Sequence, residues 1–492
     1  MKKTKIVCTI SDINCDVDFL KDLYDRGMNV VRMNTAHAND EGIHNLIANV
    51  RKVSKMIPIL IDTKGPEIRT TVFPEGYAGK TIVFEPGDQV RMVGNADGVS
   101  THEQISMNYA NFTDDVPVGA SVLIDDGELA FKVIAKEGDS LIAEAQNHGE
   151  MGQRKSVNVP GVSIKLPSLT EKDKHNIDLA IREDIDFIAH SFVRSKQDVL
   201  DIQEILDAQR SKIKIIAKIE NQEGVDNIDE ILDVAYGVMV ARGDLGIEVA
   251  QEKIPGIQRE LIRKCMKRNK PVIVATQMLH TMIKNPRPTR AEISDIANAV
   301  FAQTDAVMLS GETAYGSYPR EAVETMAKVC EEAEREIDSQ RYEVPAHFEA
   351  QSPNVTSYLC KQAALSIECM GSKALITDNK TGRTSRVLCS YRPKAPIYAL
   401  CYNMRVCRRL GLSYGVSPHY VEYGADSNIR NFLFHGLTHL TEEHSFLDPK
   451  DLITYVGGST DKGASFMEIN TVEKILNVKD GYIDLAEMSM NG

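Results

Sequence analysis

Short apolar runs alternate with amphipathic stretches along the first two thirds of the chain. The runs are rich in β-branched residues and lie at 5–10, 30–34, 57–62, 186–192, 213–219, 237–241, 271–275 and 306–309. A hydroxyl residue followed three positions later by an acid, a helix-start pattern, stands at Thr170, Ser195 and Thr289. Continuous apolar strands that alternate with helices predict a parallel sheet buried on both faces. Eight such units in roughly 250 residues predict a closed (β/α)8 TIM barrel.

The segment from about residue 70 to 157 interrupts this alternation. Its helical period is lost, and turns such as Glu85-Pro86-Gly87-Asp88 separate alternating strands. The pattern predicts a small antiparallel β domain, a β-barrel inserted after the third strand. An insertion there projects from the face that carries the chemistry of barrel enzymes, so we expect a lid. A surface embellishment is the alternative.

A second pattern of strands and helices begins after residue 340. Strand-like runs at 374–377, 397–401, 415–421 and 452–456 predict an open α/β domain. The change of pattern falls at residues 344–353, where Pro, His and Gln interrupt it. The predicted fold class is therefore α/β, with a barrel at 1–69 and 158–340, a β lid at 70–157 and a C-terminal α/β domain at 341–492.

Composition narrows the partners and the compartment. A formal charge of −13 argues against broad binding of nucleic acid or anionic membranes, but not against a local basic pocket for a small phosphorylated substrate. The nine cysteines form no CxxC pair, which indicates reduced and mostly buried thiols. No apolar stretch reaches the roughly 18 residues of a membrane helix, and the start of the chain is unlike a signal peptide. We expect a cytoplasmic protein.

The carboxyl ends of the predicted strands carry the candidate chemistry, because active sites of β/α barrels collect there. The polar residues at these ends are Arg32, Asn34, Asp62, Lys218, Glu220, Arg242, Asp244, Thr276, Ser310 and Glu312. Cations, carboxylates and hydroxyls that converge on one mouth predict an active site.

Glu220 and Asp244 end adjacent strands, so both carboxylates can reach one point. Oxygen ligands of this kind suit Mg²⁺ or Mn²⁺, whose remaining positions are filled by substrate and water. A pair of salt bridges at the rim is the alternative. Gly243 and Gly246 would allow backbone N–H groups to approach an acidic substrate at the start of a short helix.

Lys218 lies within an apolar strand and is predicted to form a Schiff base or to provide a fixed positive charge for an anion. A structural lysine is the alternative. Arg32 and Arg69 flank residues 62–67 and could clamp a phosphate with two hydrogen bonds each. The isolated His37 and His190 are interpreted as packing or supporting residues. No P-loop, dinucleotide-binding Gly-x-Gly-x-x-Gly or protein-kinase catalytic loop is present.

Long strings at these positions resemble one family, pyruvate kinase. They are VRMN (31–34), DTKGPEIR (62–69), KIEN (218–221), MVARGDLG (239–246), ATQML (275–279), NPRPTRAE (285–292) and MLSGETA (308–314). Their order and spacing and the inserted β segment extend the resemblance over residues 1 to about 340. The remainder is similar to the C-terminal domain of the family.

The resemblance implies transfer of a phosphoryl group from phosphoenolpyruvate to ADP, the last step of glycolysis, in a homotetramer. It implies Mg²⁺ on Glu220 and Asp244, and a second Mg²⁺ that arrives with the nucleotide. The implied catalytic residues are Lys218, Arg32, Thr276 and Ser310, with Ser310 helping to deliver a proton through water. The implied substrate-binding residues are Arg32, Lys218, Gly243, Asp244 and Thr276, and the nucleotide-binding residues are Arg69, Asn34 and His37.

The resemblance also implies a K⁺ site on Asn34, Asp62 and Thr63. The family commonly has a serine ligand where this chain has Ala36, so one oxygen is missing. Members that need no K⁺ usually carry lysine where Glu67 stands, and an acidic residue leaves negative charge for a cation. We therefore expect K⁺ dependence with weaker binding.

A loop in the C-terminal part is similar to the family's site for a phosphorylated allosteric effector. Hydroxyls, glycine and backbone N–H groups at a helix start form an anion nest, and Lys380, Arg383 and Arg386 add positive charge. The candidate residues are Thr377, Asn379, Lys380, Thr381, Gly382, Arg383, Thr384 and Ser385. An ordinary helix-capping turn is the alternative.

Two other functions remain open from the sequence. One is a divalent-metal aldolase or lyase on the same barrel, which would handle pyruvate enolate without a nucleotide. The other is a metabolite-binding protein without activity. The inserted lid argues against the first, and the intact set Lys218, Glu220, Asp244 and Thr276 argues against the second.

Overall fold

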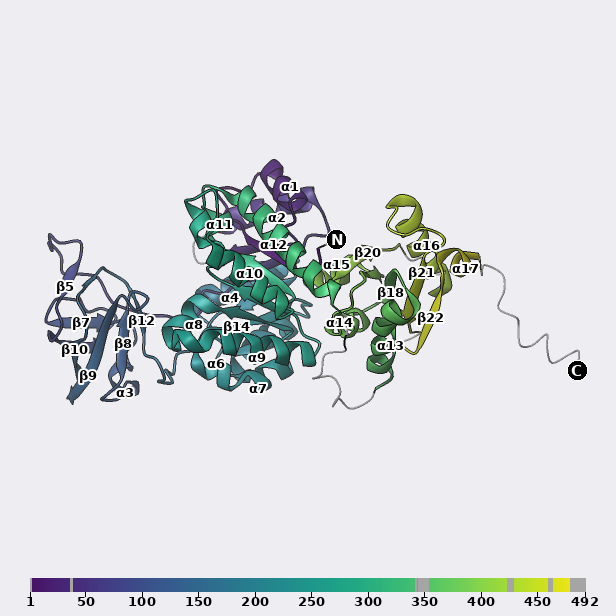
Figure 1. The fold of residues 1–492 in the computed structure, drawn as a ribbon. Coiled ribbons are helices and arrows are strands. Elements are labelled where there is room, and N and C mark those ends of the chain that lie inside the picture. Colours follow the sequence, from purple (N-terminus) through teal and green to yellow (C-terminus); the bar gives the residue numbers. More distant parts are fainter. Residues whose placement is uncertain are drawn as a thin grey trace, which may run out of the picture.

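The computed structural model describes residues 2–35, 39–340, 343, 354–422, 429–458 and 463–477. Figure 1 shows three bodies in a row, with the inserted β sheet at one end, the barrel in the middle and the C-terminal sheet at the other end. The predicted change of pattern at 344–353 lies outside the described residues. None of the described helices is long and apolar enough to cross a membrane.

Eight parallel strands close the central barrel in the order β1-β17-β16-β15-β14-β13-β3-β2. Each of them lies within one of the eight predicted apolar runs, so the predicted barrel is confirmed. The strands are β1 (Lys5–Thr9), β2 (Val30–Asn34), β3 (Ile59–Asp62), β13 (Phe187–His190), β14 (Lys214–Ile219), β15 (Gly237–Ala241), β16 (Val272–Ala275) and β17 (Ala306–Leu309).

Burial on both faces explains why these strands are continuously apolar. Val7 and Val30 belong to the cluster inside the barrel, whereas Ile6 and Cys8 pack with the surrounding helices. Successive side chains of a strand point to opposite faces, so a strand with two buried faces needs apolar residues at almost every position. This requirement produces the runs that are visible in the sequence.

Helices surround the barrel, and the predicted capping boxes at Thr170 and Thr289 begin α4 and α10. The helices are α1 (Val17–Asp25), α2 (Asp40–Val53), α4 (Glu171–Arg182), α5 (Lys196–Ala208), α6 (Gln222–Asp226), α7 (Ile228–Val234), α8 (Arg242–Glu248), α9 (Ile254–Lys267), α10 (Arg290–Phe301), α11 (Gly311–Ala314) and α12 (Pro319–Ser339). The 3₁₀ helices η1 (Gln251–Lys253) and η2 (His280–Ile283) lie between them.

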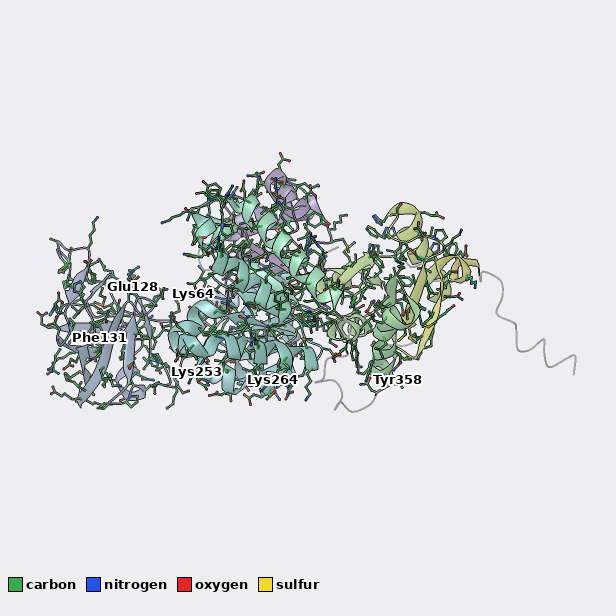
Figure 2. All side chains as sticks on the ribbon, in the orientation of Figure 1. Lys64, Glu128, Phe131, Lys253, Lys264 and Tyr358 are labelled. Atoms are coloured by element: carbon green, nitrogen blue, oxygen red, sulfur yellow. The ribbon has the colours of Figure 1, made fainter. Side chains whose placement is uncertain are left out.

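The inserted segment forms a seven-stranded sheet in the order β4-β12-β8-β9-β10-β6-β7 around buried side chains such as Phe131 (Figure 2). Its strands are β4 (Ile68–Arg69), β6 (Gln89–Gly94), β7 (Gln104–Met107), β8 (Ser121–Ile124), β9 (Leu129–Glu137), β10 (Ser140–Ala145) and β12 (Ser156–Asn158). A separate antiparallel pair, β5 (Ile82–Phe84) with β11 (Gly149–Met151), and the short α3 (Phe112–Asp115) complete the insertion.

Hydrogen bonds join the two edge strands of the inserted sheet, so that it curls into a barrel. Thr70 bridges Met107, and the Asn108 amide donates to the Arg69 carbonyl at 3.0 Å. The expectation of a wholly antiparallel sheet was wrong at one pair, because β6 and β7 run parallel. Residues 95–103 form a connection between these two strands that is long enough to return the chain to the same end of the sheet.

The C-terminal sheet has the order β20-β19-β18-β21-β22. Its strands are β18 (Ala374–Asn379), β19 (Ile397–Cys401), β20 (Val416–Tyr420), β21 (Leu452–Gly457) and β22 (Phe466–Thr471), and the helices are α13 (Val355–Met370), α14 (Arg383–Ser390), α15 (Met404–Leu410), α16 (Ile429–Thr438) and α17 (Val472–Asn477). The antiparallel edge strand β22 was not predicted. Its residues are only partly buried, so it lacks the apolar run that marks the other strands.

The C-terminal part is attached to the amino-terminal ends of the barrel strands. Asp305, directly before β17, accepts hydrogen bonds from Arg392 at 2.9 and 3.1 Å and from the Tyr414 amide at 3.0 Å. Leu412 packs into the cluster inside the barrel. This attachment leaves the carboxyl ends of the strands available for chemistry. Eight of the nine cysteines are buried, as predicted, and only Cys369 is exposed.

We predict that Arg392→Met destabilises the protein, because it leaves Asp305 buried without its ionic partner. Both side chains are 3% exposed, and removing one partner of such a pair costs about 3–5 kcal/mol. Calorimetric unfolding should show a clearly lower midpoint. The control is Arg335→Met, since Arg335 pairs with Glu332 on the surface, where an ion pair contributes at most about 1 kcal/mol. Equal midpoints for the two variants would contradict the prediction.

Candidate active site at the mouth of the barrel

The carboxylate of Asp62, at the end of β3, is shared by two cations. Arg32, on β2, donates to both of its oxygens, from Nε at 2.9 Å and from Nη2 at 2.6 Å. Lys218, on β14, places Nζ at 3.2 Å from Asp62 Oδ2. Burial alone would raise the pKa of Asp62, but the charges of Arg32 and Lys218 outweigh it and lower the pKa below its ordinary value. Asp62 therefore holds both cations in place as an anion.

Lys218 is a fixed positive charge in this network. Its Nζ lies 2.9 Å from Glu220 Oε1 and donates to Ser191 Oγ at 2.8 Å. Burial would lower the pKa of Lys218, but the carboxylates of Glu220 and Asp62 together raise it above its ordinary value. A Schiff base requires a neutral amine, so the surroundings favour the electrostatic role among the alternatives that the sequence left open.

Glu220 and Asp244 form a pair of carboxylates beside Lys218. The Phe192 amide donates to Glu220 Oε2 at 2.7 Å, whereas the buried Oε1 accepts no well-aligned hydrogen bond and is held only by the charge of Lys218. Burial, followed by the negative charge of Glu220, raises the pKa of Asp244 to about 7. Two cations (Arg32, Lys218) face three carboxylates (Asp62, Glu220, Asp244) here, so full ionisation leaves one net negative charge.

This pair of carboxylates fits a divalent cation. Glu220 Oε1 has an unused acceptor position, and a cation beside the two carboxylates would offset both the burial and the charge of Glu220 that raise the pKa of Asp244. Hard oxygen ligands are those that Mg²⁺ and Mn²⁺ prefer. Glu220 and Asp244 are the residues that would hold the ion.

Thr276 follows β16 in an unusual backbone conformation, with φ of +76°, and Gln277 has φ of +56°. A β-branched residue rarely adopts this region, and such strain collects at functional sites. Arg242 supports the bend by donating to the carbonyls of Ala275 at 3.2 Å and Thr276 at 2.7 Å. A Cβ atom on Gly243 would lie 2.7 Å from Thr276 Cγ2, so only glycine fits beside this side chain.

Two of the polar residues predicted at the carboxyl ends of the strands, Arg242 and Glu312, bind backbone groups instead of facing the mouth of the barrel. Arg242 binds the carbonyls after β16 and Asp295, at 2.7 Å. Glu312 is 2% exposed and accepts from the amides of Leu279 at 3.0 Å and Ser310 at 2.8 Å. Ser310 itself is half-buried at the start of α11. Glu312 thus fixes the loops that carry Thr276 and Ser310.

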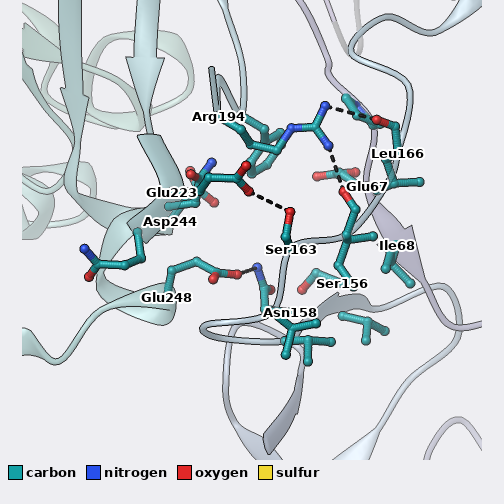
Figure 3. Close-up of a pocket in the computed structure, with 18 of the residues that line it drawn as sticks. Glu67, Ile68, Ser156, Asn158, Ser163, Leu166, Arg194, Glu223, Asp244 and Glu248 are labelled. Carbon is teal, nitrogen blue, oxygen red and sulfur yellow. Dashed lines mark hydrogen bonds between the residues drawn. The ribbon is translucent and has the colours of Figure 1, made fainter. Parts of the chain in front are cut away.

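A cleft of about 620 Å³ lies between the inserted β domain and the rim of the barrel (Figure 3). Asp244 and Phe192 line it from the barrel, and Arg69 and Lys155 line it from the insertion. Hydrogen bonds cross it where residues 158–166 return to the barrel. Asn158 donates to Glu248 at 3.1 Å, Ser163 to Glu223 at 3.0 Å, and Arg194 to the carbonyls of Ile164 at 2.8 Å and Leu166 at 3.0 Å.

Known proteins share both the sequence and the fold. Residues 1–323 match the family described as pyruvate kinase, barrel domain, and residues 358–471 match pyruvate kinase, alpha/beta domain. A pyruvate kinase of Borreliella burgdorferi is 45% identical over 479 residues, which is 96% of this chain and 98% of the relative. A pyruvate kinase of Geobacillus stearothermophilus is 46% identical over 429 residues, 85% of this chain and 72% of the relative. The crystal structure of a pyruvate kinase from Cryptosporidium parvum has a TM-score of 0.88 at 35% identity and covers 96% of both chains.

The chain belongs to the pyruvate kinase family. This confirms the resemblance drawn from the sequence strings, and with it the interpretation of the chain as a phosphotransferase.

The structure brings together Arg32, Asp62, Lys218, Glu220 and Asp244 from the set expected of a pyruvate kinase. Two hydroxyl residues were missed. Thr9, on β1, accepts from Arg32 Nη1 at 2.8 Å, and Ser191, directly after β13, accepts from Lys218. Both are polar residues at the carboxyl ends of barrel strands. The criterion that selected the other candidate residues therefore applies to them as well.

The residues expected around K⁺ are occupied by internal contacts. The Thr63 hydroxyl accepts from the Ser191 amide at 3.0 Å and lies 3.1 Å from His190 Nδ1. Burial lowers the pKa of His190 to about 4, which agrees with its supporting role and a neutral ring. Glu67 accepts from Arg69 Nε at 2.8 Å. His37 and Ala36 lie outside the described residues.

Three of the eight candidate effector residues are buried and stabilise the loop through hydrogen bonds to one another. Thr377, Asn379 and Ser385 are buried, and Ser385 Oγ lies 2.7 Å from Thr377 Oγ1 and donates to Asn379 Oδ1 at 3.0 Å. Asn379 and the other five candidates line a small cavity of about 30 Å³, together with Asp378, Gly458 and Gly463; the five are Lys380, Thr381, Gly382, Arg383 and Thr384. Gly382, with φ of +77°, begins α14.

We predict that Mg²⁺ displaces a proton from Asp244. With a pKa of about 7, this carboxyl is mostly protonated at pH 6 in metal-free protein and must ionise to bind the ion. Calorimetric titration at pH 6 in buffers of different ionisation enthalpy should detect proton release approaching one per ion. Affinity should rise from pH 5.5 to 7.5, and Asp244→Asn should remove both effects. Binding at pH 6 without proton release would show that Asp244 is already ionised.

Proposed function

We propose that the mouth of the barrel transfers the phosphoryl group of phosphoenolpyruvate to ADP, giving pyruvate and ATP, the last step of glycolysis. The observation that carries this proposal is the buried pair of cations, Arg32 and Lys218, held by Asp62 beside the two carboxylates Glu220 and Asp244. Positioning and charge stabilisation are the main requirements of phosphoryl transfer, and this arrangement supplies both.

In this reaction the bond between phosphorus and the enol oxygen breaks, and phosphorus bonds to a terminal oxygen of ADP. Mg²⁺ held by Glu220 and Asp244 would neutralise charge on the substrate oxygens. The Arg32 guanidinium, oriented by Asp62 and Thr9, would hold the phosphoryl group in line. The Lys218 ammonium would stabilise charge on the phosphoryl group and on the enolate that leaves.

The enolate then takes a proton at its methylene carbon to become pyruvate. Thr276, in its strained conformation, would sit at the enolate, and Ser310 would help to deliver the proton through water. The amides of Gly243 and Asp244, at the start of α8, would approach the substrate carboxylate. Because Gly243 has no side chain, its backbone and Thr276 can approach the same substrate.

ADP, with a second Mg²⁺, would enter the cleft between the insertion and the barrel, which Arg69 lines. Asn34 and His37 are the other two residues that the family resemblance assigns to the nucleotide. The inserted β domain would close over both substrates as a lid and exclude water. The connection at residues 158–166 supports this role. It has no helix or strand after Asn158, and a few hydrogen bonds attach it to the rim, which can be exchanged as the lid moves.

Regulation and assembly follow the family in our proposal. A phosphorylated effector would bind at Lys380–Thr384, with Thr377, Asn379 and Ser385 shaping the loop from inside. The residues Lys380–Thr384 of the cavity lining include two cations and the start of α14, which suit a phosphate. We propose a homotetramer in the cytoplasm, without nucleic-acid or membrane partners.

We predict that the protein forms pyruvate only when phosphoenolpyruvate, ADP, Mg²⁺ and K⁺ are all present. Lys218→Met should lower kcat by at least about 10²-fold, because it removes a fixed charge from the transition state. The control is Lys253→Met, which removes an exposed lysine at η1 (Figure 2) and should keep full activity. Both variants should show native circular dichroism.

The same assay separates the other functions. Pyruvate formed without ADP would favour the lyase, and no pyruvate under any condition would favour the binding protein.

We also predict activation by K⁺ at a site of Asn34, Asp62 and Thr63 that is weakened by Ala36. At constant ionic strength, activity should rise when K⁺ replaces tetramethylammonium. Ala36→Ser restores the missing ligand oxygen and should lower the half-saturating K⁺ concentration severalfold. Activity that is equal in K⁺-free and K⁺-replete buffer would refute K⁺ dependence.

A further inference from the structure

Three histidines form a cluster in the C-terminal part of the protein. His419 lies on β20, His439 begins the π-helix η4 (His439–Glu443), and His444 follows that helix. Each offers one ring nitrogen such that all three atoms lie within 4.8 Å of one another. His439 Nε2 and His444 Nε2 are 3.1 Å apart. The cluster lies on the C-terminal sheet, at the opposite end of the barrel from the catalytic mouth (Figure 1).

The surroundings hold these rings in place. Phe446 stacks on His444 at 5.1 Å between ring centroids and on Tyr398 at 5.7 Å. The Ser417 hydroxyl lies 3.0 Å from His419 Nε2, and a hydrogen bond to one ring nitrogen orients the other toward a ligand. The π-helix adds a separate signal, because this rare geometry is often found at functional sites.

The distances match a metal site closely. Metal–nitrogen bonds of about 2.0–2.1 Å in a tetrahedral site place ligand nitrogens about 3.4 Å apart. The separation of His439 and His444 is already close to this value, and small rotations of the rings would bring His419 into range.

We propose that His419, His439 and His444 bind one divalent transition-metal ion, with Zn²⁺ as the preferred class. Imidazole selects Zn²⁺, Cu²⁺ or Ni²⁺, whereas Mg²⁺ prefers the carboxylates of the catalytic mouth. Three imidazoles leave a fourth position for water or a further ligand. The ion would link the strand β20 to the chain that follows α16, which adds a cross-link to the C-terminal sheet.

Equilibrium dialysis tests the proposal on the full-length chain, purified without a histidine tag and freed of metal by a chelator. All proteins carry Cys369→Ser, because Cys369 is the exposed thiol and could bind zinc itself. Excess Mg²⁺ occupies the catalytic carboxylates. We expect one Zn²⁺ per chain, and at least about tenfold weaker binding after His439→Gln or His444→Gln, since each variant loses a ligand.

The matched control is His435→Gln, which removes an exposed histidine from α16, outside the cluster, and should retain the ion. Zn²⁺ should also raise the unfolding midpoint of the parent protein and of His435→Gln, but not of the cluster variants, since a ligand of the native state stabilises it. Matching midpoints without metal establish that the variants fold. Equal zinc binding by all variants, or none by the parent protein, would overturn the proposal.

Discussion

The shared carboxylate of Asp62 is the interaction on which the mouth of the barrel depends. Burial of a guanidinium and an ammonium costs several kcal/mol each, and an anion between them offsets that cost. Asp62 occupies this position because β3 lies between β2, which carries Arg32, and β13, which adjoins the strand of Lys218. Strand order therefore determines which charges meet. Without Asp62, two like charges would face one another in a buried site; Arg32 would keep only its hydrogen bond to Thr9 among the contacts described above, and Lys218 would depend on Glu220 and Ser191.

The two ends of the barrel separate catalysis from assembly. At the carboxyl ends, Asp62 and Glu220 are buried beside Lys218 and Asp244 lines the cleft under the insertion, and at the amino ends, Asp305 and Asp186 bind Arg392 and Arg408 of the C-terminal part. Buried ion pairs occur at both ends, and at the mouth three carboxylates face two cations, which leaves one negative charge when all are ionised. Substitutions at the amino ends should therefore lower the stability of the fold, whereas substitutions at the mouth should lower the catalytic rate.

Apolar runs predicted every barrel strand, because burial on both faces leaves little freedom in sequence. The same logic missed β22, an edge strand whose partial exposure permits Glu468 and Asn470. At the site, the position of a polar residue at a strand end was enough to predict the cluster of charged side chains around Asp62 and Lys218. It was not enough to predict the direction in which each side chain points. Arg242 and Glu312 turn toward backbone groups, and Thr377 and Ser385 turn inward, although all four stand where ligand-binding residues would. Direction depends on loop geometry such as the positive φ of Thr276, which no local pattern in the sequence indicates.

That bend at Thr276 explains why a glycine must stand at residue 243. A left-handed β-branched residue costs on the order of 1–3 kcal/mol and persists only when its surroundings hold it. Arg242 holds the carbonyl side of the bend, and the absence of a side chain on Gly243 leaves room for Thr276 Cγ2. Asp244 follows directly, so the backbone that leaves room for Thr276 also sets the direction of the Asp244 carboxylate at the mouth. In the string Arg242-Gly243-Asp244, Arg242 supports the bend, Gly243 leaves room for Thr276, and Asp244 places a carboxylate at the mouth. None of the three can shift along the chain without misplacing the others.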